Sequence, residues 1–348
     1  MMGVSAPSRP STEVESAVAG SGIDIVVADR VGWIRLDRPE ALNALTLEMV
    51  TSMRAALAHW ETDPQIDSYL VTGEGRAFCA GGDVRWIVEE IAERPDNVRA
   101  FWRAEYDLDL AIHQLHKPYV AVMDGIVMGG GVGISAHGRH RIVTERTRLA
   151  MPELRIGFCP DVGGTRLLAN APGEVGLHVA LTSASLEAAD IIYCGLADRA
   201  INSRDLHSLL ESPPGVLRLA QQHQEPPCPS LAAQRPWIDE CYSAPTVELI
   251  LERLRSHPQQ LARNAATIIE SQPPTALKVA LRALRTARQA SDLAEVLAME
   301  FGIVSRSLIH HDFTEGIRAR MVEKRSPVWQ PATLSEVTDA AVAEFFDS

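Results

Sequence analysis

The spacing of apolar residues divides the first two hundred residues into alternating strands and helices. Short apolar runs predict strands at 23–28, 31–36, 68–72, 118–123, 140–144 and 148–150. Apolar residues at helical spacing predict helices at 47–62, 83–92, 97–116 and 130–137. Strands that alternate with helices indicate an α/β fold, in which helices cover a largely parallel sheet.

The pattern changes in the second half of the chain. Prolines and polar residues punctuate 203–244, which predicts a loop or an insertion. From 245 onward the apolar spacing is helical, and it predicts helices at 245–255, 257–270, 274–289, 291–309 and 312–322. We therefore divide the chain into a disordered tail (1–22), an α/β core (23–202), a proline-rich connection (203–244) and a C-terminal helical region (245–348).

Composition restricts the class of protein and its partners. The 348 residues are 46% hydrophobic and 22% charged, which is typical of a globular chain. The net charge of -12 argues against a nucleic-acid partner, and no apolar stretch is long enough to span a membrane. An anionic small molecule stays compatible with this charge, because helix N-termini and a few arginines bind phosphates locally.

Cysteine usage and the N-terminus predict a location. The five cysteines are scattered and lack CxxC spacing, as expected of reduced thiols inside a cell. Residues 1–22 contain one arginine, two glutamates and no apolar core. Neither a secretory signal nor a mitochondrial presequence has this composition. We therefore expect a cytoplasmic protein.

The segment from Asp124 to Gly164 carries the candidate chemistry. Three consecutive glycines, Gly129–Gly131, open a helix of small residues, and Glu153 and Asp161 follow. Glycine lets another group approach the main chain closely, and the first N–H groups of a helix have no acceptor within it. Free N–H groups beside two carboxylates suit a reaction that builds negative charge on a carbonyl oxygen.

A second glycine turn lies upstream. The strand Ser68–Thr72 leads to Gly81-Gly82-Asp83, and a helix is predicted to follow. This strand-to-helix turn supplies further N–H groups, and Asp83 suits the helix N-cap. One donor from each turn would form a two-pronged oxyanion hole.

The ordered set of motifs resembles the crotonase, or enoyl-CoA hydratase/isomerase, superfamily over about residues 23–348. The matching segments are RPEALNALTLEM (38–49), FCAGGDV (78–84), KPYVAVMDGIVMGGGVGIS (117–135), RLAMPELRIGFCPDVGGTRLL (148–168) and ALTSASLEAADIIYCGLAD (180–198). Within the superfamily the chain is most similar to the 3-hydroxyisobutyryl-CoA hydrolases. Gly133 stands where hydratases carry a catalytic glutamate, and Asp161 where they usually have glycine. The C-terminal part also resembles the extended tail of the hydrolase branch.

The resemblance implies a spiral of ββα units and a set of site residues. Gly82 and Gly130 would be the oxyanion donors. Glu153 would attack the thioester carbonyl or activate water, and Asp161 would orient water, hold the substrate hydroxyl or shuttle the proton. The C-terminal region would help to close the acyl pocket. The expected substrate contacts are Glu40, Ala41, Asn43, Ala80, Gly81, Asp83, Gly129 and Gly133.

The same resemblance implies hydrolysis of a short branched 3-hydroxyacyl-CoA in valine breakdown. Coenzyme A is then part of the substrate, and no other cofactor is expected. No metal is expected either, because His310-His311-Asp312 lacks the spacing of helical ligands. The basic residues that could meet the CoA phosphates are Arg38, Arg76 and Arg85.

Several alternatives stay open at this point. Asp161 precedes a helix and could be its N-cap. Asp83 could likewise be a helix cap, and His137 could be a structural residue with no part in the chemistry. A hydratase or isomerase could use the same thioester site, and so could a non-enzymatic acyl-CoA-binding protein. Whether the chain forms a homo-oligomer is also open.

Overall fold

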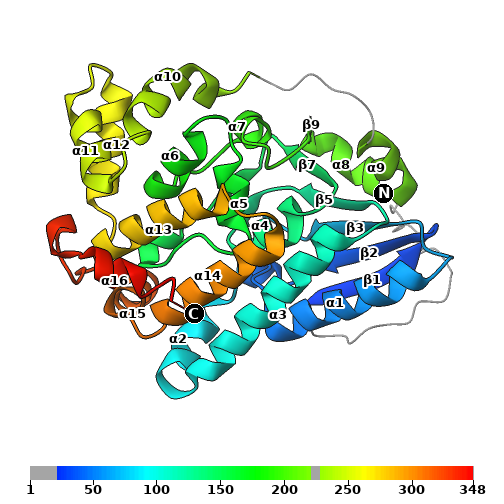
Figure 1. Cartoon of the computed structure of the whole chain (residues 1–348). Helices are drawn as coiled ribbons and strands as arrows, with labels where there is room; N and C mark the ends of the chain where they lie inside the picture. The colour runs from blue at the N-terminus through cyan, green and yellow to red at the C-terminus, as the bar shows by residue number, and fades with distance from the viewer. Residues whose placement is uncertain (1–21, 221–227, 348) are drawn as a thin grey trace, which may run out of the picture.

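The computed structural model describes residues 22–220 and 228–347, and it contains two sheets (Figure 1). The larger sheet has the order β1-β2-β3-β5-β7-β9, and the smaller has the order β4-β6-β8. β1 pairs antiparallel with β2, and every other pairing is parallel. The strands are β1 (Ile23–Ala28), β2 (Val31–Leu36), β3 (Ser68–Gly73), β4 (Ala77–Cys79), β5 (Tyr119–Met123), β6 (Ile126–Met128), β7 (His140–Thr144), β8 (Arg148–Ala150) and β9 (Arg199–Ile201).

Three successive units repeat the same path through the two sheets. In each unit the first strand (β3, β5 or β7) joins the large sheet and the second (β4, β6 or β8) joins the small sheet. Helical segments follow each pair: α2 (Val84–Glu93) and α3 (Pro95–Gln114), then α4 (Gly130–Ala136), then η2 (Glu153–Ile156) and α5 (Gly164–Ala169). This confirms the expected spiral of ββα units, although no residue-level repeat marks it in the sequence.

The central strands are apolar because both faces of the large sheet are covered. All residues of β5 are buried, and so are the first five of β3. Neighbouring side chains enter different cores: Tyr69 and Val71 join the main core, whereas Leu70 packs with Leu206 and Val216. A parallel strand buried on both faces reads as a continuous apolar run, which is the signal that the sequence carried.

Helices occupy much of the segment that we expected to be a loop. They are α8 (Ser203–Leu210), α9 (Pro213–Ala220) and α10 (Ser230–Tyr242). The loop prediction was wrong for these residues, because Leu206 and Val216 cover a face of the large sheet. A proline pair also begins α9, where missing N–H groups cost little. Pro226-Pro227 and the expected tail at 1–21 lie outside the described residues.

The C-terminal helices pack on the core, as the sequence predicted. They are α11 (Val247–Ser256), α12 (Gln260–Glu270), α13 (Pro274–Ala287), α14 (Leu293–Ser307), α15 (His311–Ile317) and α16 (Asp339–Ala343). α13 contacts α5 and α6 (Val175–Thr182), and α14 contacts α3 and α5. The helix predicted at 312–322 is divided, because α15 ends at Ile317 and a π-helical segment, Arg318–Glu323, continues it.

Two glycines hold α15 directly against η2. A Cβ on Gly157 would lie 2.3 Å from the backbone oxygen of Asp312, and a Cβ on Gly316 would lie 2.5 Å from that of Ile156. Neither position has room for a side chain, so the two backbones meet. The C-terminal region is thereby fixed beside the segment that begins at Glu153.

Candidate active site

A cavity of about 310 Å³ lies where the two glycine turns, η2 and the C-terminal region meet. Its walls are mostly apolar and aromatic, which is typical of a small-molecule site. The lining residues are Ala80, Gly81, Gly82, Val84, Ile87, Phe101, Trp102, Glu105, Met128, Gly129, Gly130, Pro152, Glu153, Arg155, Ile156, Phe158, Asp161, Phe313, Ile317, Arg320 and Met321.

The two glycine turns adjoin in the cavity wall. A Cβ on Gly81 would lie 3.4 Å from the backbone nitrogen of Gly130. Gly81 has φ +98° and Gly129 has φ +48°, both in the left-handed region that side chains disfavour. Within the described chain, the N–H groups of Gly82 and Gly130 donate to no acceptor. Two free backbone donors are therefore available to a carbonyl oxygen of a bound molecule.

Glu153 begins η2 and faces the glycine turn at Gly129–Gly131. Pro152 precedes the helix, and its fixed φ helps to set the direction of the chain at this point. The Glu153 side chain is 7% exposed, and its Oε1 would lie 3.3 Å from a Cβ on Gly129. Its Oε2 has no hydrogen-bond partner among the described residues. Burial, and then the nearby Asp161, raise the pKa of Glu153 well above its usual value.

Asp161 enters the same cavity from the following loop. Its Oδ2 accepts a hydrogen bond of 2.7 Å from the hydroxyl of Tyr106. Burial raises the pKa of Asp161 to about 7, although this hydrogen bond favours the charged form. The Asp161 side chain caps no helix, because the N-cap residue of α5 is Gly163 and no side chain caps that helix. A carboxyl group that titrates near neutral pH can both take up and release a proton.

Glu300, which was not predicted from the sequence, supports the loop that follows Asp161. Glu300 lies on α14 and accepts hydrogen bonds from the Gly163 nitrogen at 2.7 Å and the Thr165 nitrogen at 3.0 Å. The Thr165 hydroxyl donates a third bond, of 2.5 Å. Burial nevertheless raises the pKa of Glu300 to about 8. The C-terminal region thus fixes the position of Asp161 from a distance of more than a hundred residues along the chain.

Glu105 on α3 was also missed, although it lines the cavity. The side chain is 3% exposed, and its Oε1 would lie only 2.0 Å from a Cβ on Gly130. This oxygen has no hydrogen-bond partner within the described chain. Burial, and then Asp161, raise the pKa of Glu105 well above its usual value. The signal in the sequence was an acid at a helical position whose neighbours, Phe101 and Tyr106, are apolar or aromatic.

Seven of the predicted residues line this cavity, and five lie outside its wall. Those inside are Ala80, Gly81, Gly82, Gly129, Gly130, Glu153 and Asp161. Those outside are Glu40, Ala41, Asn43, Asp83 and Gly133.

Two of the outside residues hold the chain in place. Asn43 is fully buried, and its amide donates to the backbone oxygens of Glu74 and Ala77. Asp83 caps α2 through the Arg85 and Trp86 nitrogens, as the structural reading predicted.

Three further candidate residues from the sequence have contacts or pKa shifts that do not favour a catalytic or phosphate-binding role. His137 is half-buried and a nitrogen of its ring contacts the Val162 oxygen at 2.7 Å, and removal of the ring from water lowers its pKa to about 4. Burial raises the pKa of Cys159, which disfavours a thiolate nucleophile. Arg38 pairs with Asp83 at 2.7 Å, which leaves its guanidinium partly engaged. No group of side chains in the described ranges, 22–220 and 228–347, could hold a metal ion.

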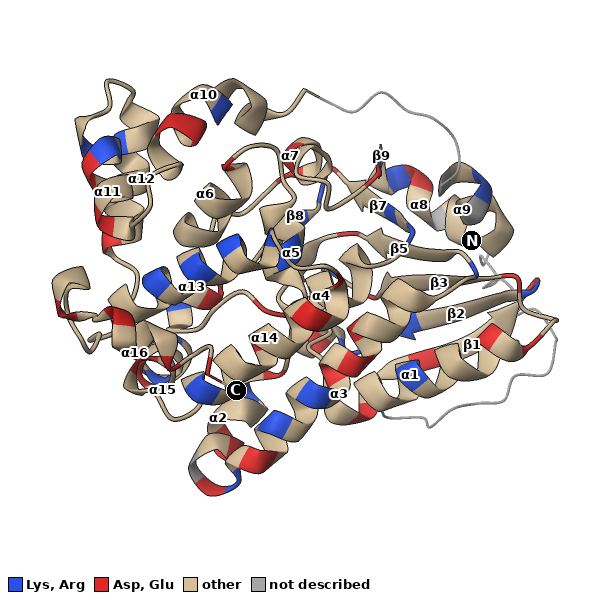
Figure 2. Ribbon diagram, in the orientation of Figure 1, with Lys and Arg blue, Asp and Glu red and all other residues tan. Residues whose placement is uncertain are grey.

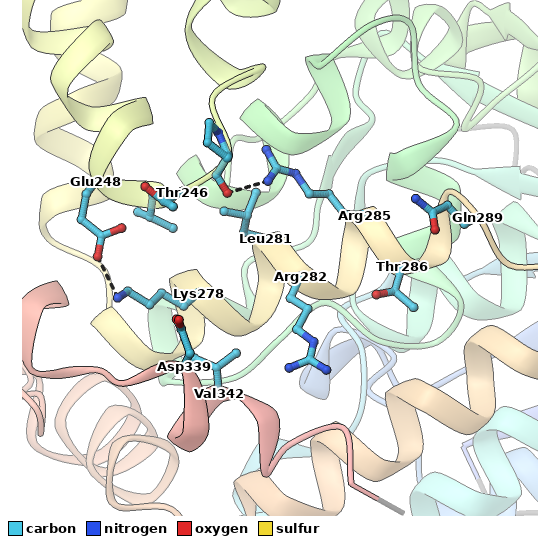
Figure 3. Close-up of a pocket in the computed structure, with 12 residues that line it drawn as sticks. Thr246, Glu248, Lys278, Leu281, Arg282, Arg285, Thr286, Gln289, Asp339 and Val342 are labelled. Atoms are coloured by element: carbon cyan, nitrogen blue, oxygen red, sulfur yellow. Dashed lines mark hydrogen bonds and ion pairs between the residues drawn. The ribbon is translucent and has the colours of Figure 1, made fainter.

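A second cavity, of about 430 Å³, lies between α11, α13 and α16 (Figure 3). Basic residues follow one another along α13 (Figure 2), and three of them line it. Lys278 pairs with Glu248 at 2.7 Å, and Arg285 donates to the backbone oxygen of Pro245 (Figure 3). Arg282 lies 4.2 Å from the centre of the Phe346 ring. Each of these cations is therefore already engaged within the C-terminal region.

The family model described as enoyl-CoA hydratase/isomerase matches residues 31–346. The chain belongs to this family. Its curated relatives include proteins named mitochondrial 3-hydroxyisobutyryl-CoA hydrolase. The Danio rerio protein is 38% identical, covering 96% of this chain and 91% of the relative. The Homo sapiens protein is 39% identical, covering 91% and 86%. The resemblance drawn from the motifs is therefore confirmed.

Solved structures of the same fold carry other names. A carnitinyl-CoA dehydratase from Mycobacterium thermoresistibile has a TM-score of 0.91 at 45% identity, covering 94% of this chain and 97% of that one. An enoyl-CoA hydratase from Rhodobacter sphaeroides has a TM-score of 0.89 at 37% identity, with the same coverage. The crotonase-like fold is thus confirmed, and an acyl-CoA substrate is consistent with the family.

The comparisons correct one expectation from the sequence. The N-terminal composition led us to expect a cytoplasmic protein, but the curated hydrolase relatives are named as mitochondrial. These names contradict that expectation. It had rested mainly on the absence of a recognisable presequence pattern in residues 1–22. Among the helices of the described residues, none is long and apolar enough to cross a membrane.

Proposed function

We propose that this protein hydrolyses the thioester of 3-hydroxyisobutyryl-CoA, releasing 3-hydroxyisobutyrate and free CoA. One observation carries the proposal: Glu153 and Asp161 enter the same buried cavity beside the free amides of Gly82 and Gly130. The names of the hydrolase relatives support the same reaction. In the pathway that this substrate implies, the enzyme would act in valine breakdown.

The glycine amides would form the oxyanion hole. The thioester oxygen would accept hydrogen bonds from Gly82 and Gly130, and these bonds strengthen as the carbonyl carbon becomes tetrahedral. Removing one such donor typically costs about 3 kcal/mol of transition-state stabilisation. Because the cavity is largely apolar, water competes little with these donors.

Glu153 would act on the carbonyl carbon, as nucleophile or as the base that activates water. In either case it must be ionised when it acts, and its buried surroundings oppose this. Asp161 lines the same cavity and has a pKa of about 7, so it would accept the proton that the reaction displaces. The thiolate of CoA would leave when the tetrahedral intermediate collapses, and it would take up a proton to give the free thiol. If Glu153 is the nucleophile, water would then cleave the acyl–Glu153 anhydride; if Glu153 is the base, the attacking water itself supplies the new oxygen of 3-hydroxyisobutyrate.

The shape of the cavity favours a small acyl group. A volume of about 310 Å³ must also hold the thioester end of the pantetheine arm. Trp102, Phe158 and Phe313 pack against one another with ring centres 4.7 to 6.2 Å apart, and all three line the cavity. A short branched chain would pack against these rings, and the carboxyl group of Asp161 or Glu105, both in the cavity wall, would bind its hydroxyl.

Enoyl-CoA hydration is the second candidate, because two solved structures at 45% and 37% identity are named a dehydratase and a hydratase. An assay on a panel of short acyl-CoA and enoyl-CoA esters distinguishes the two. We expect the purified protein to release free thiol from 3-hydroxyisobutyryl-CoA. Loss of enoyl absorbance without thiol would support hydration, and binding without either change would support a non-enzymatic role.

A further inference from the structure

Asp109 is a buried acid that the proposed reaction does not use. It lies on α3 with 0% of its surface exposed, and neither carboxylate oxygen has a hydrogen-bond partner in the described chain. Burial, and then Glu105, raise the pKa of Asp109 well above its usual value, which favours the neutral form of the carboxyl group. An unpartnered buried carboxyl group is costly and therefore requires a reason.

The carboxyl group of Asp109 fills the space above Gly133. A Cβ on Gly133 would lie 2.7 Å from both Oδ1 and Oδ2 of Asp109. One turn earlier on each helix, Glu105 fills the space above Gly130 in the same way. At positions 130 and 133 the face of α4 that meets α3 therefore carries no side chain, and two acids spaced four residues apart on α3 occupy that space.

We propose that Asp109 is a specificity-determining residue, which keeps any side chain from extending out of position 133 into the space beside Glu105. A carboxylate extending from position 133 would stand next to the cavity. The site then has Glu153 and Asp161 as its acting pair, which suffices for thioester hydrolysis. This inference rests on the proposed function, because it explains why this member of the family would hydrolyse rather than hydrate. Asp109 does not line the cavity itself. It acts by occupying the space that a side chain at position 133 would need.

The steric pairing can be tested without any activity. Gly133→Ala adds a single methyl group against Asp109, and we expect it to lower the melting temperature by several degrees. Asp109→Ala removes the obstacle, and in this background Gly133→Ala should cost much less. An equal loss in both backgrounds would show that the two positions do not compete for space, and would overturn the proposal.

The second test measures which reaction occurs. Asp109→Ala alone should keep thiol release from 3-hydroxyisobutyryl-CoA within about threefold of the parent, as expected for a change outside the cavity wall. Gly133→Glu alone should lose hydrolysis and gain no hydration. Asp109→Ala/Gly133→Glu should fold and hydrate a short enoyl-CoA about tenfold faster than Asp109→Ala.

The outcomes separate the two claims. A folded double variant that gains no hydration would refute the role of Asp109 in specificity, and so would a Gly133→Glu variant that hydrates as fast as the double variant. If the parent protein releases no thiol, the proposed hydrolase function fails. The melting temperatures would still report whether Asp109 and Gly133 exclude each other.

Discussion

The hydroxyl of Tyr106 donates a 2.7 Å hydrogen bond to Oδ2 of Asp161, and both side chains are buried. The two residues are 55 positions apart in the chain, and α3 brings them together. Burial disfavours the charged carboxylate, whereas the hydroxyl stabilises it. The balance of these effects leaves the pKa of Asp161 at about 7, where proton exchange is easy at physiological pH.

We expect Tyr106→Phe to move the pH dependence of hydrolysis. The hydrogen bond lowers the pKa of Asp161, so its removal raises that pKa. If ionised Asp161 accepts the proton, the rising limb of kcat/KM against pH shifts to higher pH. Tyr119→Phe is the matched control, because that buried hydroxyl donates to the Ile134 oxygen instead. An unshifted profile in Tyr106→Phe would argue that Asp161 takes no part in proton transfer.

Glu153→Gln should abolish turnover and leave CoA binding intact. The amide keeps the shape of the side chain but removes the charge, so thiol release should fall by about two to four orders of magnitude. Because Oε2 of Glu153 has no partner in the described chain, the fold should tolerate the change. Thiol release and CoA affinity are measured on the same preparation. Near-parental thiol release from this variant would refute the catalytic assignment.

Asp161→Gly should cut hydrolysis strongly without creating a hydratase. The carboxyl group and its bond to Tyr106 are lost together, while position 133 still carries no side chain. Thiol release and enoyl absorbance, followed in parallel, report the two reactions. Hydrolysis at the parental rate would mean that Asp161 serves the fold alone.

Gly130→Ala should lose activity and stability together. The added Cβ would lie 2.0 Å from Oε1 of Glu105 and 3.1 Å from Leu45, so the backbone that carries the proposed donor must move. Gly302→Ala is the control, because only the Phe345 oxygen, at 3.8 Å, approaches that position within a helix. That change should raise stability by about 0.5–1 kcal/mol. Thiol release and melting temperature are compared for both variants; full activity in Gly130→Ala would contradict the oxyanion assignment.

The sequence predicted the strands and most helices because local apolar spacing specifies them. β2 and α1 (Leu47–Thr62) begin and end where the pattern placed them. The glycine turns and Glu153 were found because motif residues lie close together in the chain. Glu300 was not found, because its partner Thr165 lies 135 positions away and only tertiary packing joins them.

The buried acids of α3 show a signal that was present but not used. Glu105 and Asp109 stand at helical positions that otherwise carry core residues such as Phe101 and Ile112. An acid in the apolar stripe of an amphipathic helix departs from the pattern, and such departures concentrate at functional sites. The α9 helix was missed for the opposite reason, since Pro213 and Pro214 were taken to indicate a loop although they stand at its start.

The buried carboxyl groups predict that stability falls as pH rises above 6.5. The pKa values of Asp161 and Glu300, about 7 and about 8, lie above their usual values, so the folded state keeps protons that the unfolded chain has released. Their contribution to the free energy of unfolding is fully present below the pKa that they have in the unfolded chain. It is lost as the pH rises through the pKa that they have in the folded state. His137 and His178 act oppositely, since burial lowers their pKa values to about 4, but their effect ends near the unfolded value of 6.5.

Between pH 6.5 and 8 the carboxyl groups therefore decide the slope. The free energy of unfolding, measured by chemical denaturation at both pH values, should be lower at pH 8. Asp161→Asn cannot ionise, and its amide oxygen still accepts from Tyr106, so this variant should lose less stability over the same interval. If the parent and Asp161→Asn show the same dependence on pH, Asp161 does not hold a proton in the folded state between pH 6.5 and 8 that the unfolded chain has released. Its proposed role as a proton acceptor that titrates near neutral pH would then have to be abandoned.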